Sequence, residues 1–211
     1  MNEFLIKIFQ LIVLIFSVMV HEVSHGLAAY RLGDDTAKKM GRLNLNPLNH
    51  IDPFGSVFLP LFLILVNSPI LVGWAKPVLY DPKNLKNPKS GAAWIGIAGP
   101  LSNIALAVIF AILTRVIAPF AGELTYPLVM FFNSVVFINI LLAIFNLVPI
   151  PPLDGSKLLF AFLPYKYRQV QSFLEQYGMV ILLFFIFFGF ELITPIIRGF
   201  YYLLVGKWAI L

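Results

Sequence analysis

Long stretches without a charged residue constrain this chain more than any other feature. Ser90–Thr114 and Leu124–Leu153 contain no Asp, Glu, Lys or Arg. About 20 apolar residues in a row are enough for a helix to cross the hydrocarbon core of a bilayer. The composition agrees, since 60% of the residues are hydrophobic, 12% are charged and the mean hydropathy is +0.89, whereas soluble domains are about half apolar and a quarter charged. The sequence therefore predicts a polytopic α-helical membrane protein.

The apolar runs predict an all-α transmembrane bundle with about four full spans and one further apolar hairpin. The run Phe54–Ala75 is interrupted by Pro60 and Pro69. Interruptions of this kind favour a re-entrant or broken hairpin over a full crossing. We expect residues 1–211 to form a single transmembrane domain. The expected full spans are Asn2–Leu32, Ser90–Thr114, Leu124–Leu153 and Gln176–Gly199.

The distribution of basic residues is a second argument for the hairpin. If Phe54–Ala75 re-enters, 11 of the 15 Lys and Arg residues lie on the side where the first span ends, and the exceptions are Lys7, Arg115, Arg198 and Lys207. If it crosses fully, the bias disappears. Because cytoplasmic loops are enriched in Lys and Arg, we expect that side to face the cytoplasm of a prokaryotic cell. The net charge of +5 then orients the protein in the lipid bilayer, and we expect no nucleic-acid partner.

The pentapeptide His21-Glu22-Val23-Ser24-His25 lies inside the first apolar run and carries the candidate chemistry. Residues four apart on a helix share one face, so the two histidines can bind the same metal ion. Glu22 then lies beside the metal, where a carboxylate can take a proton from water. The chain has no cysteine, so zinc would be held by His, Asp or Glu. Two histidines with only a packing role are disfavoured, because ionisable groups in membrane helices are costly and usually functional.

A third zinc ligand is expected from Asp154, which directly follows a charge-free span. The prolines before it break the helix, and a broken helix at membrane depth is tolerated only where protein or water covers the backbone. The hairpin topology also returns Asp154 to the side of the two histidines. The sequence therefore predicts one zinc ion per chain, held by His21, His25 and Asp154. Asn103 and Asn146 are candidates for binding substrate or an oxyanion.

Other interpretations of these residues remain open. Asp154 could form a turn in Pro-Leu-Asp-Gly, and Asn103 could bond between helices. The zinc site could serve binding or transport without proteolysis, but metal storage needs no general base, and a transporter would be expected to show repeated halves. A structural zinc site would require a fourth ligand, for which His50 is the candidate. The favoured interpretation of His50, however, is a polar loop residue near the entry to the re-entrant run.

Three patterns in this order resemble the site-2 protease family of intramembrane zinc metalloproteases, in a compact form without a PDZ domain. They are His-Glu-x-x-His at 21–25, Gly-Pro-Leu-Ser-Asn at 99–103 and Asn-x-x-Pro-x-Pro-Pro-Leu-Asp-Gly at 146–155. Segments 41–47 and 73–78 are also similar to bacterial and archaeal members. The likeness covers roughly residues 15 to 165. In one departure from the family pattern, the metal motif lies on the first rather than a later helix.

The resemblance implies a function for these residues. His21, His25 and Asp154 would be zinc ligands, and Glu22 would be catalytic. The single domain would be a metalloendopeptidase that cuts transmembrane segments of substrate proteins, as in regulated intramembrane proteolysis. Gly99 and Asn103 would lie near the substrate. The sequence leaves the substrate, the pathway and the oligomeric state open.

Overall fold

The computed structural model describes residues 3–66, 73–123 and 125–210, and within these ranges the regular structure is helical without strands. Four helical runs in the described residues are long and apolar enough to cross a membrane. The predicted all-α transmembrane bundle is thereby confirmed. Asn2, Pro69 and Leu124 lie outside the described residues. The runs are α1 (Glu3–Arg31), α4 (Pro88–Ile117), α5 (Tyr126–Asn146), and α7 (Arg168–Phe184) continued into α8 (Phe190–Val205).

The central helix of the bundle is α4, which contacts α1, α5, α8 and the short helix α6 (Asp154–Phe162). The buried side of α4 carries mostly small residues, and small side chains let helix backbones approach closely in membranes. At Gly96 an added Cβ would lie 3.1 Å from the backbone oxygen of Asp154. The glycines of α4 therefore set how closely α6 approaches it. The buried residues include Gly91, Gly96, Gly99, Asn103, Ala107, Ala111 and Thr114.

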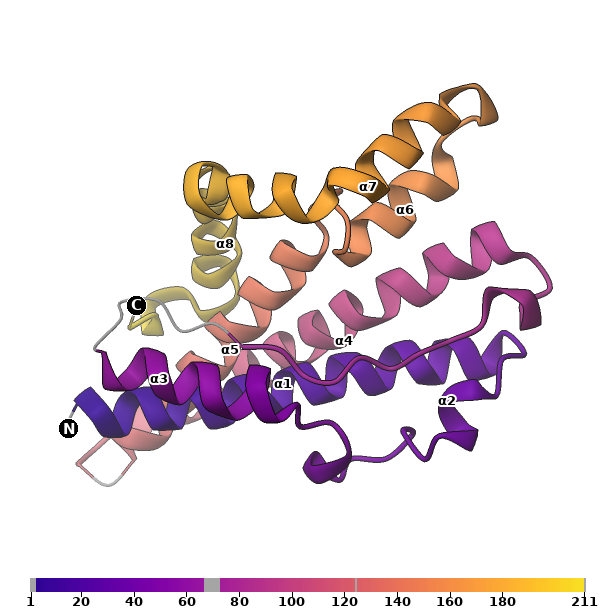
Figure 1. Ribbon diagram of the computed structural model, residues 1–211. Coiled ribbons are helices and arrows are strands. Elements are labelled where there is room, and N and C mark those ends of the chain that lie inside the picture. Colours follow the sequence, from indigo (N-terminus) through magenta and orange to yellow (C-terminus); the bar gives the residue numbers. More distant parts are fainter. Residues whose placement is uncertain (1–2, 67–72, 124, 211) are drawn as a thin grey trace.

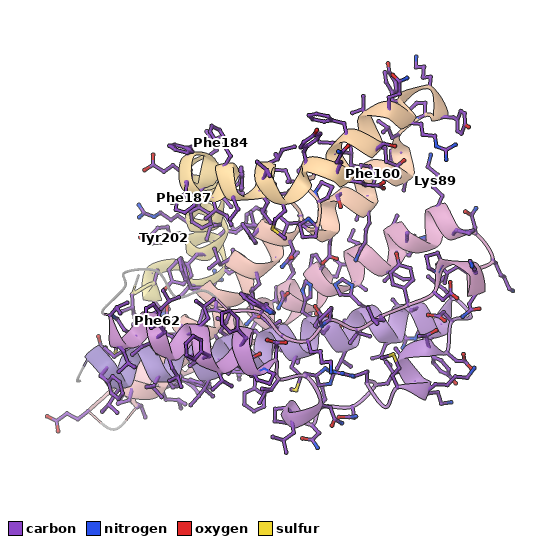
Figure 2. The ribbon with its side chains drawn as sticks, in the orientation of Figure 1. Phe62, Lys89, Phe160, Phe184, Phe187 and Tyr202 are labelled. Atoms are coloured by element: carbon purple, nitrogen blue, oxygen red, sulfur yellow. The ribbon has the colours of Figure 1, made fainter. Side chains whose placement is uncertain are left out.

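The last predicted span is longer than expected and changes direction within it. A π-helical turn, Phe185–Gly189, joins α7 to α8, and π-turns are a common cause of sharp helix bends. Figure 1 shows α7 lying across the bundle and α8 turning from this corner back toward α5. Phe184 and Phe187 lie on the outside of the corner (Figure 2) and are largely exposed. The chain is thus helical well before Gln176 and beyond Gly199.

The C-terminal helix α8 is fixed to the bundle by apolar packing and by hydrogen bonds. Tyr201 is fully buried in the core that α8 shares with α4 and α5, and its hydroxyl donates to Asn133 Oδ1. Arg115, near the end of α4, donates from Nη2 to Leu203 O over 2.7 Å. By contrast, α7 comes close to the Pro151 backbone at Gly178. The bend therefore separates a packed helix from one that lies over the turn preceding α6.

The apolar run that follows α1 folds back on itself, so that its end lies next to its beginning. It forms a π-helical turn, Pro53–Phe58, and then α3 (Leu59–Leu65), which lies beside the N-terminal half of α1 (Figure 1). On return, Trp74 N–H donates to Gly55 O over 3.1 Å, and Ser56 Oγ donates to Trp74 O over 2.7 Å. The two ends of the run are therefore adjacent, as the hairpin interpretation requires.

Residues Gly73–Asp81, here called the return segment, then run without helix along α1 and α4 (Figure 1). The end of the segment is held by Asp34, which is fully buried. Asp34 accepts hydrogen bonds from the Asp81 N–H, from Asn84 Nδ2 and from Thr36. Burial raises the pKa of Asp34, but these hydrogen bonds outweigh it and lower the pKa below its ordinary value. Asp34 therefore stays ionised at neutral pH and anchors the segment beyond the end of α1.

The two ends of α4 mark the two ends of the bundle. Arg115 joins the end of α4 to the end of α8, while Lys89 Nζ at the start of α4 donates to Leu163 O over 2.7 Å. Figure 2 shows Lys89 far from Tyr202 of α8. Arg115 and Lys89 thus lie at opposite ends of the bundle, in agreement with the predicted separation of basic residues.

Candidate metal centre

The structure brings the three predicted metal ligands together from distant parts of the chain. Asp154 Oδ2 lies 3.0 Å from His21 Nε2 and 3.0 Å from His25 Nε2, and the two Nε2 atoms are 3.0 Å apart. All three side chains are buried. Within the described part of the chain, these residues form the one group of His, Cys, Asp or Glu side chains with the geometry to hold a metal ion.

The donor atoms fit zinc in kind and in spacing. Zinc binds imidazole nitrogen and carboxylate oxygen at about 2.0–2.2 Å, and tetrahedral ligands at that radius lie about 3.3 Å apart. The observed separations of 3.0 Å therefore need to widen only slightly around an ion. Three protein ligands leave a fourth position for water or substrate, as in catalytic zinc sites.

Both imidazole rings are oriented by hydrogen bonds at Nδ1. His21 Nδ1 lies 2.6 Å from Asn103 Oδ1, and His25 Nδ1 lies 2.6 Å from the backbone oxygen of Ile95. Both partners are acceptors, so each Nδ1 carries a proton and donates it. Each Nε2 then keeps its lone pair for a metal. Ile95 was not identified from the sequence, because a backbone carbonyl gives no signal in the residue type.

The metal centre depends on a glycine of α4 that faces both rings. An added Cβ at Gly99 would lie 2.5 Å from His25 Nε2 and 2.6 Å from His21 Nε2. Real Cβ atoms do not approach other atoms so closely, so any larger residue would displace the imidazoles. Gly99 therefore lies at the histidine pair itself, which is closer to the chemistry than the substrate-side location that the family resemblance implies.

Asp154 is placed by a turn and held by a lysine. It is the first residue of α6. Gly155 allows the start of α6 to lie against the backbone of Leu147, because an added Cβ at Gly155 would overlap Leu147 O. Asp154 Oδ1 accepts a hydrogen bond from Lys157 Nζ over 2.9 Å, which leaves Oδ2 for the histidines. The role of Lys157 was missed because the residue was counted only as a loop charge. Its spacing of three residues from Asp154 within a helix was the available signal.

Glu22 lies next to the histidines on α1 and is bound by the return segment. Its Oε2 accepts the Val78 N–H over 2.8 Å. Space for this contact comes from Gly26, one turn further along α1, where an added Cβ would lie 2.9 Å from a Val78 methyl group. The hydrogen bond fixes the direction of the Glu22 carboxylate. Val78 was not identified as a partner, because it acts through its backbone.

The two asparagines are in different situations. Asn103 is fully buried; its oxygen is bound to His21 Nδ1, and its Nδ2 donates to Asn139 Oδ1 and Ser17 O. The oxygen and both amide protons of Asn103 are therefore already hydrogen-bonded within the protein. This geometry favours a role in orienting His21 and does not favour the predicted contact with substrate. Asn146 ends α5, is partly buried, and donates to Leu142 O.

His50 is not part of the metal centre. The His50 side chain is buried, and its Nε2 lies 2.8 Å from the backbone oxygen of Asn44. Within the described ranges, His50 does not belong to the group of residues that could hold a metal ion. The structure therefore gives no support to a closed structural zinc site with His50 as the fourth ligand.

Comparison with known proteins agrees with this geometry. The model for "Peptidase family M50" matches residues 9–125 and 116–189. The chain belongs to this family, the site-2 proteases. It is 38% identical over 179 residues to "Putative zinc metalloprotease YwhC" of Bacillus subtilis, covering 83% of this chain and 78% of that protein. It is 28% identical over 191 residues to "Putative zinc metalloprotease Rip2" of Mycolicibacterium smegmatis, covering 90% of this chain and 69% of that protein.

A comparison with solved structures finds no match for the chain. The family and the two relatives identify this protein as a zinc metalloprotease with zinc as its cofactor. The interpretation as a zinc-binding or transport protein without proteolysis is therefore not supported.

Substitution of Gly99 tests the geometry of the metal centre. Gly99→Ala places a methyl group against both Nε2 atoms, and we expect zinc content to fall at least tenfold in metal analysis of the purified protein. Gly199→Ala is the matched control, since Gly199 is also helical but has no atom within 4 Å of an added Cβ. Gly199→Ala should keep zinc unchanged. Full zinc in Gly99→Ala would show that the rings are not arranged as described.

Proposed function

We propose that this protein is an intramembrane zinc endopeptidase, which hydrolyses peptide bonds inside transmembrane segments of other proteins. The observation that supports this most is the buried His21–His25–Asp154 group, whose two histidines lie within the apolar helix α1. His21 precedes the end of α1 at Arg31 by ten residues, which is about 15 Å along the helix axis. A metal centre at that depth is reached by a polypeptide that is itself in the membrane.

In the proposed reaction, His21, His25 and Asp154 hold the zinc ion and Glu22 moves the proton. When bound, zinc supplies a Lewis acid that acidifies water and polarises a peptide carbonyl. Glu22 takes a proton from the attacking water and later gives it to the leaving amine, whose bond to the carbonyl carbon breaks. The Val78 N–H keeps the Glu22 carboxylate in place through Oε2. Asn146, at the start of the turn that leads to Asp154, is the proposed amide for substrate or oxyanion.

The substrate is proposed to be a transmembrane polypeptide that opens locally. In a regular helix the peptide carbonyls are hydrogen-bonded and shielded, so the segment must unwind before one bond reaches the metal centre. Gly, Pro or Asn near the cut site would lower the cost of unwinding. Regulated intramembrane proteolysis, in which such a cut releases part of a membrane protein, is the corresponding process.

We propose that the metal centre faces the cytoplasmic side of a prokaryotic membrane, as the basic residues indicate. The chain has no cysteine, so single cysteines at two exposed lysines test this orientation. With a membrane-impermeant maleimide on intact spheroplasts, Lys207→Cys should be labelled and Lys86→Cys should be labelled only after lysis. Labelling of Lys86→Cys in intact spheroplasts would contradict the orientation.

Glu22→Gln tests the proposed reaction. Glutamine keeps an oxygen to accept the Val78 N–H but cannot take the proton, so zinc should stay at one per chain while cleavage falls about 10²–10⁴-fold. The assay uses proteoliposomes that contain a library of single-span peptides with Gly, Pro or Asn at varied positions. Mass spectrometry of the products locates each cut.

Cuts within the apolar segments that depend on Glu22 are the expected result. Cuts confined to the soluble flanks, equal cleavage by Glu22→Gln, or a library with no Glu22-dependent cut would each contradict the proposal. Zinc content, measured on the same samples, separates loss of the metal from loss of the base.

A further inference from the structure

A chain of buried polar side chains leads away from the metal centre through three helices. Asn103 of α4 binds His21, Asn139 of α5 binds Asn103, and Ser17 of α1 binds Asn139. The distances are 2.6 Å, 2.8 Å and 2.9 Å. Asn103 and Asn139 are fully buried, and Ser17 is 3% exposed. Burying a polar side chain in an apolar bundle costs free energy unless the side chain is hydrogen-bonded. These three side chains satisfy that requirement by bonding to one another.

Two backbone carbonyls determine which way both amides point. Asn139 Nδ2 donates to Val135 O over 2.9 Å as well as to Ser17 Oγ, so its oxygen must face Asn103. Asn103 Nδ2 donates to that oxygen and, over 3.3 Å, to Ser17 O. A carbonyl can only accept, so neither amide can be reversed without placing two acceptors together. Asn103 Oδ1 is therefore turned to His21 Nδ1.

The direction of the Asn103 amide determines whether Nε2 of His21 can bind a metal. Since Asn103 presents an oxygen, Nδ1 of His21 carries the proton and Nε2 is free for zinc. His25 obtains the same tautomer directly from the Ile95 carbonyl. Within the described residues, the partner of His21 Nδ1 is a side-chain amide, that of Asn103, which could rotate if nothing held it.

We propose that Ser17, Asn103 and Asn139 form a positioning relay that fixes the tautomer and ring direction of His21 for zinc. Among the described residues, the side chains of Asn139 and Ser17 form no hydrogen bond with a metal-ligand side chain, and they act on the His21 ring through Asn103. The proposal concerns zinc binding and holds whichever substrate the enzyme cuts.

A second asparagine on the same helix provides a matched control. Asn133 of α5 is also buried, and its Nδ2 also donates to the carbonyl four residues earlier, Val129 O. Its oxygen, however, accepts from Tyr201 of α8. Replacing either asparagine by leucine removes one buried amide and its hydrogen bonds to neighbouring helices, which are those to Asn103 and Ser17 for Asn139 and that to Tyr201 for Asn133. Only Asn139→Leu breaks the relay.

Zinc affinity of the detergent-purified protein, measured by competition with a chelator, is the test. Loss of a group that orients a zinc ligand typically weakens metal binding 10- to 100-fold. We expect about tenfold weaker binding for Asn139→Leu and a change within about twofold for Asn133→Leu. Equal zinc affinities in the two variants would overturn the proposal. Thermal unfolding of the zinc-free proteins shows whether both variants lose similar stability.

Histidine NMR gives a readout that general destabilisation does not move, and Ser17→Ala gives a milder variant. The chain has three histidines, so ¹⁵N-labelled imidazoles are few enough to resolve, and His50, bound through Nε2, serves as the reference for the opposite tautomer. In zinc-free Ser17→Ala or Asn139→Leu, where no ion on Nε2 fixes the tautomer, the His21 signals should lose the single-tautomer pattern of the zinc-free wild type, while those of His25 stay unchanged. An unchanged His21 pattern in both variants would overturn the relay. Cleavage is not needed for either readout, so failure of the proposed proteolysis would be seen separately.

Discussion

The convergence of two imidazole nitrogens and one carboxylate oxygen inside an apolar bundle is the constraint on which the rest of the structure depends. A buried carboxylate without partners costs several kcal/mol. Asp154 is 6% exposed, and its two oxygens are divided between the histidines and Lys157. The same arrangement provides the negative charge that a zinc ion needs. The site therefore depends on the close packing of α1, α4 and α6.

The close approach of these helices follows from residues that have little or no side chain. Gly96 admits the backbone of Asp154, and Gly99 admits both imidazole rings. Gly26 admits Val78, through which the return segment reaches Glu22. A methyl group at any of these three glycines would clash with a residue of the metal centre or with Val78, the partner of Glu22. A bundle of larger residues with the same hydropathy would still be helical, but it would have no metal centre.

The fold and the grouping of His21, His25 and Asp154 were predictable because they depend on period and composition. The helical spacing of His21 and His25 and the position of Asp154 after a charge-free run are visible in the sequence. The hairpin followed from Pro60 and from the charge bias, and the Trp74–Gly55 hydrogen bond agrees with it. The bounds of the last span were wrong at both ends, because no residue in the Phe-rich run marks the turn at Phe185–Gly189.

The partners of the functional side chains were less predictable. Ile95 and Val78 act through backbone atoms, which no residue type reveals. Ser17 and Asn139 did carry a signal, since each is a polar residue within an apolar helix, and Ser17 precedes His21 by one turn. Asn103 was a candidate for binding substrate or an oxyanion, but its hydrogen bond to His21 favours a role in orienting that ring.

The central claim is that Asp154 completes a three-ligand zinc site with His21 and His25. Zinc content of the detergent-purified protein tests it most directly, with Asp154→Ala compared with wild type and with Asp35→Ala, a change at an aspartate with a 47% exposed side chain. We expect one zinc per chain in wild type and in Asp35→Ala, and a marked loss in Asp154→Ala, because two histidines alone bind zinc weakly. Full zinc in Asp154→Ala would place the third ligand elsewhere and contradict the account.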